Sequence, residues 1–392
     1  MSPATLLWLI TGCMMLQPLS TDFYLASLPH LAVYFSATPA QVQQTLSLFV
    51  IGFGTAQLIS GPLSDRYGRR PVLQAGLATY LLASLACALA SSLHLLVAGR
   101  FVQAVGCCTA VVVARAIIRD AYTPTEGARV IAKASSLLSL VPILGPIVGS
   151  YLQVAFGWRA AFGVHALFCA ILTWAAWRWL DETNAHKNPE ATRLSNLARG
   201  YAQITATPAF WAYTIPGALS YGSIFVFISG SSFVLIRVLH VSTADYGYIY
   251  SLGVTGYLTG TLLCRRILPR IGIARTLTLG TTVALVGGLL FLALVLAGVR
   301  HWALVLGCQF LTMCAHGINF PCTQAGSVAP FKQQAGAAAG LMGFFTMVAA
   351  WLAGTWVGVS FDGTLLPLAL TSALLGFLLF ASTRLLSRYH LA

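Results

Sequence analysis

The chain has 392 residues, of which 58% are hydrophobic and only 8% are charged, and it carries 22 Lys and Arg against nine Asp and Glu. A soluble protein of this length needs several times more charge, so the composition excludes a water-soluble fold and predicts an integral membrane protein. The net charge of +13 does not indicate nucleic-acid binding, because the basic residues form short clusters between apolar runs instead of one polar face.

Apolar runs long enough to cross a bilayer follow one another along the chain. A spanning helix needs roughly 20 such residues, and runs of this kind begin near positions 4, 42, 73, 93, 131, 160, 209, 245, 275, 302, 336 and 365. The sequence therefore predicts an all-α membrane protein with twelve transmembrane helices. No basic segment precedes the first run and no small-residue cleavage site follows it, so we expect a retained helix there.

The first predicted helix contains Asp22, which follows Pro18. Ionisable groups inside spans are costly and usually functional. An embedded carboxylate with a cation near it is the kind of group that carries a proton, and we expect Arg100 of the fourth helix to lie near Asp22 and tune it. A static pair that only orders the first half of the protein is the alternative.

The stretch GPLSDRYGRR at 61–70, after the second helix, concentrates charge in an otherwise apolar chain. The eleventh helix begins near Gly336, and its N-terminal partial positive charge is expected to attract Asp65, while Gly61 allows a close approach. This contact would latch one side of the protein shut. The residues of this predicted conformational switch are Gly61, Asp65, Arg66, Gly68, Arg69 and Arg70. An anchor that only sets the topology is the alternative.

The fourth and tenth helices carry matching polar faces. Their members are Arg100, Gln103, Cys107, Ala110 and Ala114 in one helix and Gln309, Thr312, His316, Asn319 and Thr323 in the other. A polar side on an apolar helix should face a wet cavity, which we place between the two halves. Adding the aromatic residues of the seventh and eighth helices, we predict substrate contacts from Gln103, Tyr221, Phe225, Tyr257, His316 and Asn319. Ordinary packing is the alternative for the aromatics, and a neutral, hydrogen-bonded histidine is the alternative for His316.

The longest polar stretch, at 181–200, divides the chain. We predict a six-helix bundle at 1–180, a cytoplasmic linker at 181–207 and a second six-helix bundle at 208–392. Lys and Arg in short loops are retained in the cytoplasm, and they divide seventeen to three between the two sides, which predicts cytoplasmic termini. The seventeen are Arg66, Arg69, Arg70, Arg119, Arg129, Lys133, Arg178, Lys187, Arg193, Arg199, Arg265, Arg266, Arg270, Arg275, Lys332, Arg384 and Arg388, and the three are Arg159, Arg237 and Arg300.

Enzyme signatures are absent from the sequence. It contains no GxSxG, HExxH or GxxxxGK[ST] pattern, and its nine cysteines show no metal-ligand spacing. We therefore expect no enzyme activity, no cofactor and no metal. The expected partners are a small-molecule substrate, protons and the lipid bilayer, with no nucleic acid, and the protein is expected to act as a monomer.

Several of these segments resemble motifs of the major facilitator superfamily. GPLSDRYGRR resembles the GxLxDRxGRR signature found between helices 2 and 3 of that family. Three further segments look like the drug:proton antiporter branch with twelve helices, of the Bcr/CflA multidrug efflux type. They are Leu19 to Asp22 with Pro29, Arg100 with Gln103 and Gly106, and Gly145-Pro146 with Gly149.

The resemblance implies two pseudo-symmetric six-helix bundles, a hinge at Gly145, Pro146 and Gly149, and proton coupling at Asp22. It also implies export of phenicol- or bicyclomycin-like compounds across a bacterial inner membrane, driven by the proton gradient. Some members carry a second acid two turns before Asp22, where this chain has Met14, which disfavours two-proton coupling. A proton-coupled transporter of a metabolite such as an amino acid or nucleoside is the alternative on the same fold.

Overall fold

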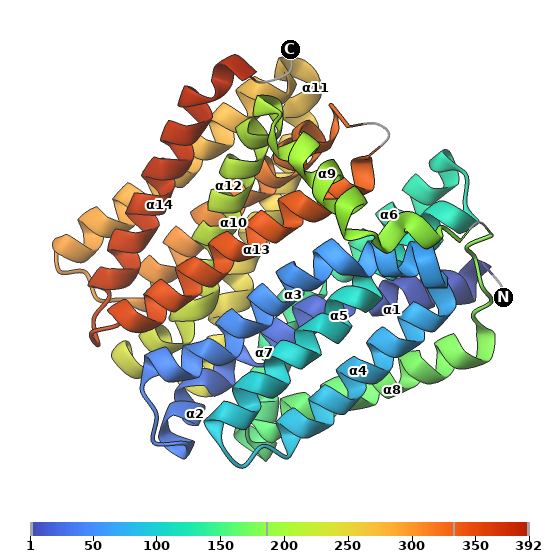
Figure 1. Cartoon of the computed structure of the whole chain (residues 1–392). Coiled ribbons are helices and arrows are strands. Elements are labelled where there is room, and N and C mark those ends of the chain that lie inside the picture. The colour runs from blue at the N-terminus through green and yellow to red at the C-terminus, as the bar shows by residue number, and fades with distance from the viewer. Residues whose placement is uncertain (1–2, 186, 332–333, 390–392) are drawn as a thin grey trace.

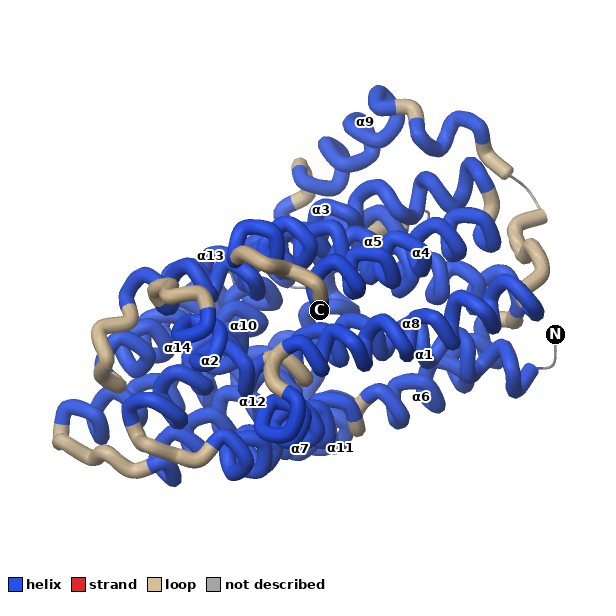
Figure 2. Tube along the Cα trace, turned by 90° about the horizontal axis from the view of Figure 1, so that it is seen from below, coloured by secondary structure: helices blue, strands red, loops and turns tan. Residues whose placement is uncertain are grey.

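The structure is a computed structural model that describes residues 3–185, 187–331 and 334–389; Lys332, one of the seventeen basic residues above, lies outside them. The described residues form helices joined by short loops, with no strand among them, as Figure 2 shows. Nearly all backbone N–H and C=O groups are therefore paired within helices, which a lipid environment requires. The predicted all-α fold is confirmed.

The first half of the chain contains six crossings, two of them interrupted. The first crossing consists of α1 (Pro3–Asp22), η1 (Leu25–Ser27) and α2 (Leu28–Tyr34), and the next three are α3 (Pro39–Tyr67), α4 (Arg69–Ala88) and α5 (Leu93–Ala121). The fifth consists of α6 (Pro124–Leu138) and α7 (Val141–Phe156), and the sixth is α8 (Arg159–Trp179).

The second half begins with α10 (Pro208–Ser232), which continues into the π-helical η3 (Phe233–Val238). After it come α11 (Thr243–Leu296), α12 (Trp302–Val328), α13 (Ala335–Ser360), α14 (Leu366–Leu385) and η4 (Ser387–Tyr389). A straight helix with the 54 residues of α11 would be about 80 Å long, far beyond a bilayer core of about 30 Å. It breaks at Gly272, whose φ of 76° favours glycine, and thus forms two crossings.

Eleven helices of the described residues are long and apolar enough to span a membrane, and α11 is one of them. Because α11 turns back at Gly272, these helices account for the twelve predicted crossings. The fifth crossing breaks between Leu138 and Val141, just before Pro142. Helix α7 then continues through Pro146. The break therefore lies nearly two turns before the predicted hinge residue, and Pro142 occupies the first turn of the new helix.

The two halves meet along two pairs of helices. Helix α13 packs along α3 and α11 packs along α7, whereas α9 (Leu194–Thr205) lies at the opposite end of the molecule from α2 (Figure 1). We call the end with α9 the linker side and the other end the far side. On the far side, the Arg237 guanidinium donates to the carbonyl of Pro29 (2.7 Å), and His30 hydrogen-bonds to Thr243 (3.0 Å).

The predicted linker contains η2 (Pro189–Thr192) and α9, and it is bonded to the first half. The Tyr201 hydroxyl donates to the carbonyl oxygen of Leu58 (2.9 Å). That carbonyl lies four residues before Pro62 of α3, which has no N–H to offer it. Tyr201 therefore satisfies the group that the proline leaves free. One turn further along α9, Ile204 is buried against Phe210 and residues of α13.

Candidate functional site

The charged loop at 61–70 folds back on its own half of the protein. The buried Arg69 guanidinium donates to Asp65, to the Ser64 hydroxyl (2.6 Å) and to Asp120 at the end of α5 (2.7 Å). Within the described residues, no hydrogen bond or ion pair joins Asp65 to the start of α13, so the expected latch contact is not made there. Gly336 lies instead against Arg119, and Gly61 lies near Val112. Arg69 is a full charge one helical turn from Asp65, so it attracts the carboxylate more strongly than a helix terminus does.

Glu182 of the linker joins this network, and the sequence analysis assigned it no role. Its carboxylate accepts hydrogen bonds from the backbone N–H groups of Arg69 (2.8 Å) and Arg70 (3.2 Å), the unpaired donors at the start of α4. Partial burial raises the pKa of Glu182, but the N–H groups of Asn184, Arg69 and Arg70 outweigh it and hold the pKa below its usual value. Gly68 has φ 107°, and a side chain there would collide with Glu182.

The two remaining arginines of the loop are held in different places. The Arg66 guanidinium lies over the Tyr67 ring (5.1 Å to its centroid) and hydrogen-bonds to Thr192 of the linker. Arg70 donates to the carbonyl of Trp177 in α8 (3.1 Å). The loop thus ties α3, α4, α8 and the linker together on the linker side.

Asp22 lies at the last residue of α1, where the first crossing breaks. It is 6% exposed and accepts a hydrogen bond from the Thr21 hydroxyl (3.1 Å). Its segment packs directly on α7, because a Cβ on Gly145 would lie 3.0 Å from Cβ of Asp22, and one on Gly149 would lie 2.7 Å from Cα of Phe23. The two glycines therefore permit the close approach that places Asp22.

Three tyrosines of the second half interact electrostatically with Asp22. The hydroxyls of Tyr221 in α10 and of Tyr246 and Tyr250 in α11 lie within electrostatic range of its carboxylate, and Tyr221 also hydrogen-bonds to Gln17 of α1. The carboxylate thus lies where the two halves face each other. Tyr246 was missed by the sequence analysis, although it precedes Tyr250 by one helical turn.

Arg100 does not pair with Asp22, contrary to expectation. Its guanidinium is fully buried in α5 and donates to the carbonyl of Thr45 (3.3 Å) and to Gln103 (2.6 Å). It also lies over the rings of Phe49 (4.1 Å) and Tyr24 (5.1 Å). Within the described ranges, no ion pair joins Arg100 to a carboxylate. The aromatic faces and the carbonyl supply the electron density that compensates its charge.

Gln103 and Asn319 were both predicted to contact substrate. Gln103 is engaged within the first half, whereas the Asn319 amide donates to the Ser220 hydroxyl (3.5 Å), the same hydroxyl that bonds His316. Gln103 accepts from Arg100 and donates to the Ser84 hydroxyl (2.8 Å), and it has no exposed surface. Asn319 is also fully buried, with its carboxamide oxygen against Gly280. Their polar atoms face the interior of their own half, because each helix has neighbours on that side as well.

His316 forms the centre of an aromatic cluster in the second half. Its Nδ1 hydrogen-bonds to the Ser220 hydroxyl of α10 (3.0 Å), so the bond is formed within one half. The rings of Tyr221 and Tyr257 lie 5.8 Å from the His316 ring, and Tyr221 leads on to Phe225 at 6.2 Å. Four predicted contacts, Tyr221, Phe225, Tyr257 and His316, are thus brought together, and Tyr221 connects them with Asp22.

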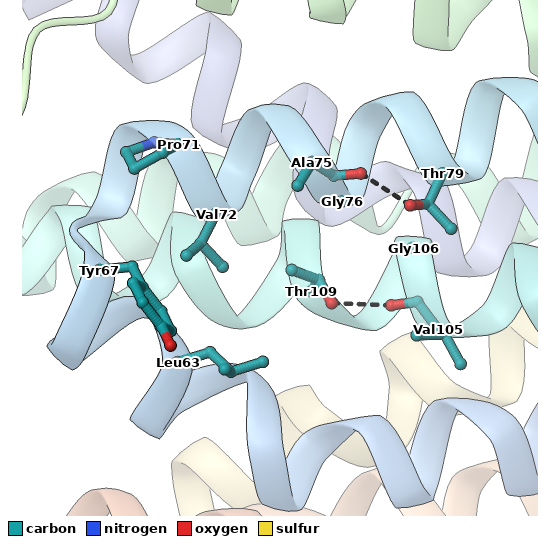
Figure 3. Close-up of a pocket in the computed structure, with 10 residues that line it drawn as sticks. All are labelled: Leu63, Tyr67, Pro71, Val72, Ala75, Gly76, Thr79, Val105, Gly106 and Thr109. Atoms are coloured by element: carbon teal, nitrogen blue, oxygen red, sulfur yellow. Dashed lines mark hydrogen bonds between the residues drawn. The ribbon is translucent and has the colours of Figure 1, made fainter. Parts of the chain in front are cut away.

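A separate groove of about 400 Å³ lies on the flank of the first half, between α3, α4 and α5 (Figure 3). Leu63, Tyr67 and Val72 line it together with seven neighbours. The hydroxyls of Thr79 and Thr109 bond to carbonyls of their own helices at 2.8 and 2.9 Å, as the dashed lines show. The groove therefore offers apolar surface and lies apart from Asp22.

Metal binding finds no support among the described residues, where no cluster of three or more His, Cys, Asp or Glu side chains occurs. All nine cysteines are buried and unbridged. His165 of α8, a third group that the sequence analysis missed, is fully buried beside the Asp22 segment. An ionisable residue in the middle of an apolar run was the signal that could have found it.

Comparison with known proteins identifies relatives over most of the chain. The family model described as Major Facilitator Superfamily matches residues 10–355. The bicyclomycin resistance protein homolog of Haemophilus influenzae is 26% identical over 296 residues, which cover 76% of this chain and 74% of that protein. The chloramphenicol resistance protein of Pseudomonas aeruginosa is 31% identical over 74% of this chain and 67% of that protein. The multidrug resistance protein MdtL of Escherichia coli is 27% identical over 93% of this chain and 92% of that protein.

Solved structures share the fold at lower sequence identity. A bacterial homolog of the human lysosomal transporter Spinster, crystallised inward-facing and unoccupied, has a TM-score of 0.72 at 15% identity and covers 100% of this chain and 99% of that one. The D-xylose-proton symporter has a TM-score of 0.71 at 13% identity, and the match covers 96% of this chain and 97% of that one.

Proposed function

The chain belongs to the major facilitator superfamily and is a transporter rather than an enzyme, and from this premise we propose that it is a proton-coupled antiporter exporting small amphipathic drugs. The substrates we propose are phenicol- or bicyclomycin-like, and the mechanism is alternating access of one site between the two halves. The names of the relatives, which include chloramphenicol and bicyclomycin resistance proteins, support this choice.

Asp22 is the observation that carries the proposal. Of the nine acidic residues it is the one that lies well inside a span, and it is buried where the two halves meet. A carboxylate that faces the tyrosines of the other half can take up a proton in one arrangement of the halves and release it in the other. Proton binding at Asp22 would thereby be linked to the rocking of the halves.

The other roles follow from position. We assign proton coupling to Asp22 with Arg100 as an indirect modulator, and substrate contacts to Tyr221, Phe225, Tyr257 and His316. The conformational switch comprises the 61–70 loop together with Gly145, Pro146 and Gly149. One proton crossing about 100 mV supplies roughly 2.3 kcal/mol, and a tenfold pH difference adds about 1.4 kcal/mol. Together they support a drug gradient of a few hundred-fold.

We place the protein in a bacterial inner membrane with the linker side and both termini in the cytoplasm. The distribution of Lys and Arg supports this orientation. The substrate then gains access from the cytoplasm, and the bonds of Arg237 and His30 on the far side close the outer end. We expect the monomer to be the working unit.

A drug transport assay with an Asp22 variant tests the proposal. Everted membrane vesicles that hold a pH gradient are given a phenicol, and dissipation of the gradient is recorded for the unaltered protein, Asp22→Asn and Asp245→Asn. Asp245 is an exposed acid at the start of α11, so its variant controls for the loss of one negative charge. We expect dissipation by the unaltered protein and Asp245→Asn only.

Two other results would change the conclusion. Dissipation by Asp22→Asn at the unaltered rate would remove Asp22 from the coupling step. No response from folded, unaltered protein would favour the alternative, a proton-coupled transporter of a metabolite such as an amino acid or nucleoside, which the same vesicles can test.

A further inference from the structure

His165 donates a hydrogen bond to the backbone of the segment that carries Asp22. Its Nε2 lies 3.0 Å from the carbonyl oxygen of Leu19, three residues before Asp22. A carbonyl oxygen only accepts, so Nε2 carries the proton in this contact. The His165 ring is packed between the rings of Phe23 (6.1 Å) and Phe162 (5.9 Å). Its orientation is therefore fixed from two sides.

The Leu19 carbonyl needs this donor because α1 ends at Asp22. The last carbonyls of a helix lose their usual N–H partners, and a buried carbonyl without a partner is costly. Leu19 receives one long bond from the N–H of Phe23 (3.3 Å). The bond from His165 supplements it and stabilises the break at which the chain turns Asp22 toward the second half.

His165 and Arg100 share Phe162 as a neighbour. In the described part of the chain, Nδ1 of His165 and Nη2 of Arg100 are both buried without a hydrogen-bond partner, and they are an acceptor and a donor. Both groups flank Phe162, since the Arg100 guanidinium lies 5.8 Å from the same ring, and the two side chains are within electrostatic range. His165 thus lies between Arg100 and the backbone next to Asp22.

We propose that His165 is a positioning residue for proton coupling: it holds the break in α1 that presents Asp22, and it connects that break with Arg100. This inference depends on the proposed antiport function. It explains how Arg100 influences Asp22 although the two form no ion pair in the described structure. A shift of Arg100 changes the electric field at the His165 ring, whose Nε2–H bonds the Leu19 carbonyl beside Asp22.

The test compares His165→Leu, which removes the donor, with His165→Gln, whose amide N–H replaces Nε2–H. Tyr80→Phe is the matched control. It removes a neighbouring contact to α1, the 2.6 Å bond between Tyr80 and Ser20, while Ser20 keeps its bond to the Leu16 carbonyl. Chloramphenicol binding is followed by tryptophan fluorescence, proton release on binding by a pH dye in weak buffer, and exchange in liposomes under a pH gradient.

We expect His165→Leu to bind chloramphenicol with unchanged affinity but to exchange it about tenfold more slowly. A tenfold change corresponds to about 1.4 kcal/mol, which is within the range for one lost buried hydrogen bond. Proton release per bound drug should fall with it. His165→Gln should recover the exchange rate and the proton release, and Tyr80→Phe should retain them. A purely structural role would lower binding and exchange together and leave the released protons per bound drug unchanged.

Equal proton release and exchange by His165→Leu and the unaltered protein would overturn the inference. If His165→Leu does not fold, His165→Asn replaces it, because its amide is too short to reach the Leu19 carbonyl. A folded His165→Gln that remains uncoupled would also overturn it. No proton release by the unaltered protein would instead contradict the proposed function.

Discussion

The contact of Gly149 with the break in the first crossing yields a quantitative prediction. In Gly149→Ala the new methyl group would lie 2.4 Å from the carbonyl oxygen of Phe23 and 2.7 Å from its Cα, whereas ordinary contacts begin at 3.4 Å. The larger difference, 3.4 − 2.4, means that the backbone at Phe23 must move by about 1 Å, because backbone cannot rotate away as a side chain can. Asp22 is the preceding residue and must move with it.

We expect Gly149→Ala to lower the free energy of unfolding by about 2 kcal/mol, within the range of overpacked cores. The transport rate should fall by on the order of tenfold or more, since Asp22, the proposed coupling residue, would be displaced by about 1 Å. The assays are thermal unfolding of the purified protein and drug-dependent dissipation of a pH gradient in vesicles.

Gly163→Ala in α8 is the matched control, because a Cβ at Gly163 meets nothing within 4 Å. It should be neutral or slightly stabilising, since alanine favours helix over glycine by roughly 0.8–1.0 kcal/mol. If Gly149→Ala matched Gly163→Ala in stability and transport, the close approach of α7 to the Asp22 segment would not be what positions the carboxylate.

Two predictions concern the charged loop. Glu182→Gln should lower the unfolding temperature at neutral pH, because the carboxylate stabilises the start of α4 by about 0.5–1 kcal/mol. Its pKa is lowered in the folded protein, so this stabilisation is present above the unfolded pKa and lost as pH falls through the folded value. The difference from the unaltered protein should therefore stay constant from about pH 7 to about pH 5 and shrink as the pH falls below about 4.3, the ordinary pKa of a glutamate. A difference that persists unchanged to about pH 3 would contradict the charge-based explanation. Arg69→Gln should lower the free energy of unfolding by about 2 kcal/mol. This is less than the loss expected when a fully buried ion pair is broken, because Asp65 remains 45% exposed. An unchanged unfolding temperature in detergent would show that Arg69 does not stabilise the loop.

The fold was predictable from the sequence because lipid imposes a strong rule on it. Twelve apolar runs required twelve crossings, and the structure has them, including the two that α11 forms around Gly272. The position of the break in the fifth crossing was harder to predict from the sequence. The chain carries Pro142 as well as Pro146, and sequence alone does not tell which of two prolines begins a helix and which is tolerated inside it.

The site was only partly predictable, because sequence gives the polar face of a helix but not the neighbour it faces. Asp22, Gly145 and Gly149 are brought together, as are Tyr221 and His316. The expected Asp22–Arg100 pair is absent from the described structure because aromatic rings and a backbone carbonyl already surround Arg100. Aromatic groups compensate a buried cation without leaving a periodic pattern in the sequence, so no spacing rule could reveal this arrangement.

The bond between Tyr201 and Leu58 determines how many linker residues are free of the first half. Glu182 holds the beginning of the linker to α4, Asn188 donates to the carbonyl of Asp65, and Tyr201 holds α9 to α3. Residues 206–207 therefore form the whole connection between α9 and α10, and the bond from the Thr207 N–H to the Ile204 carbonyl keeps it tight. Under the proposed alternating access, residues inserted before α9 would leave this connection unchanged, whereas even one added at 206–207 would lengthen it.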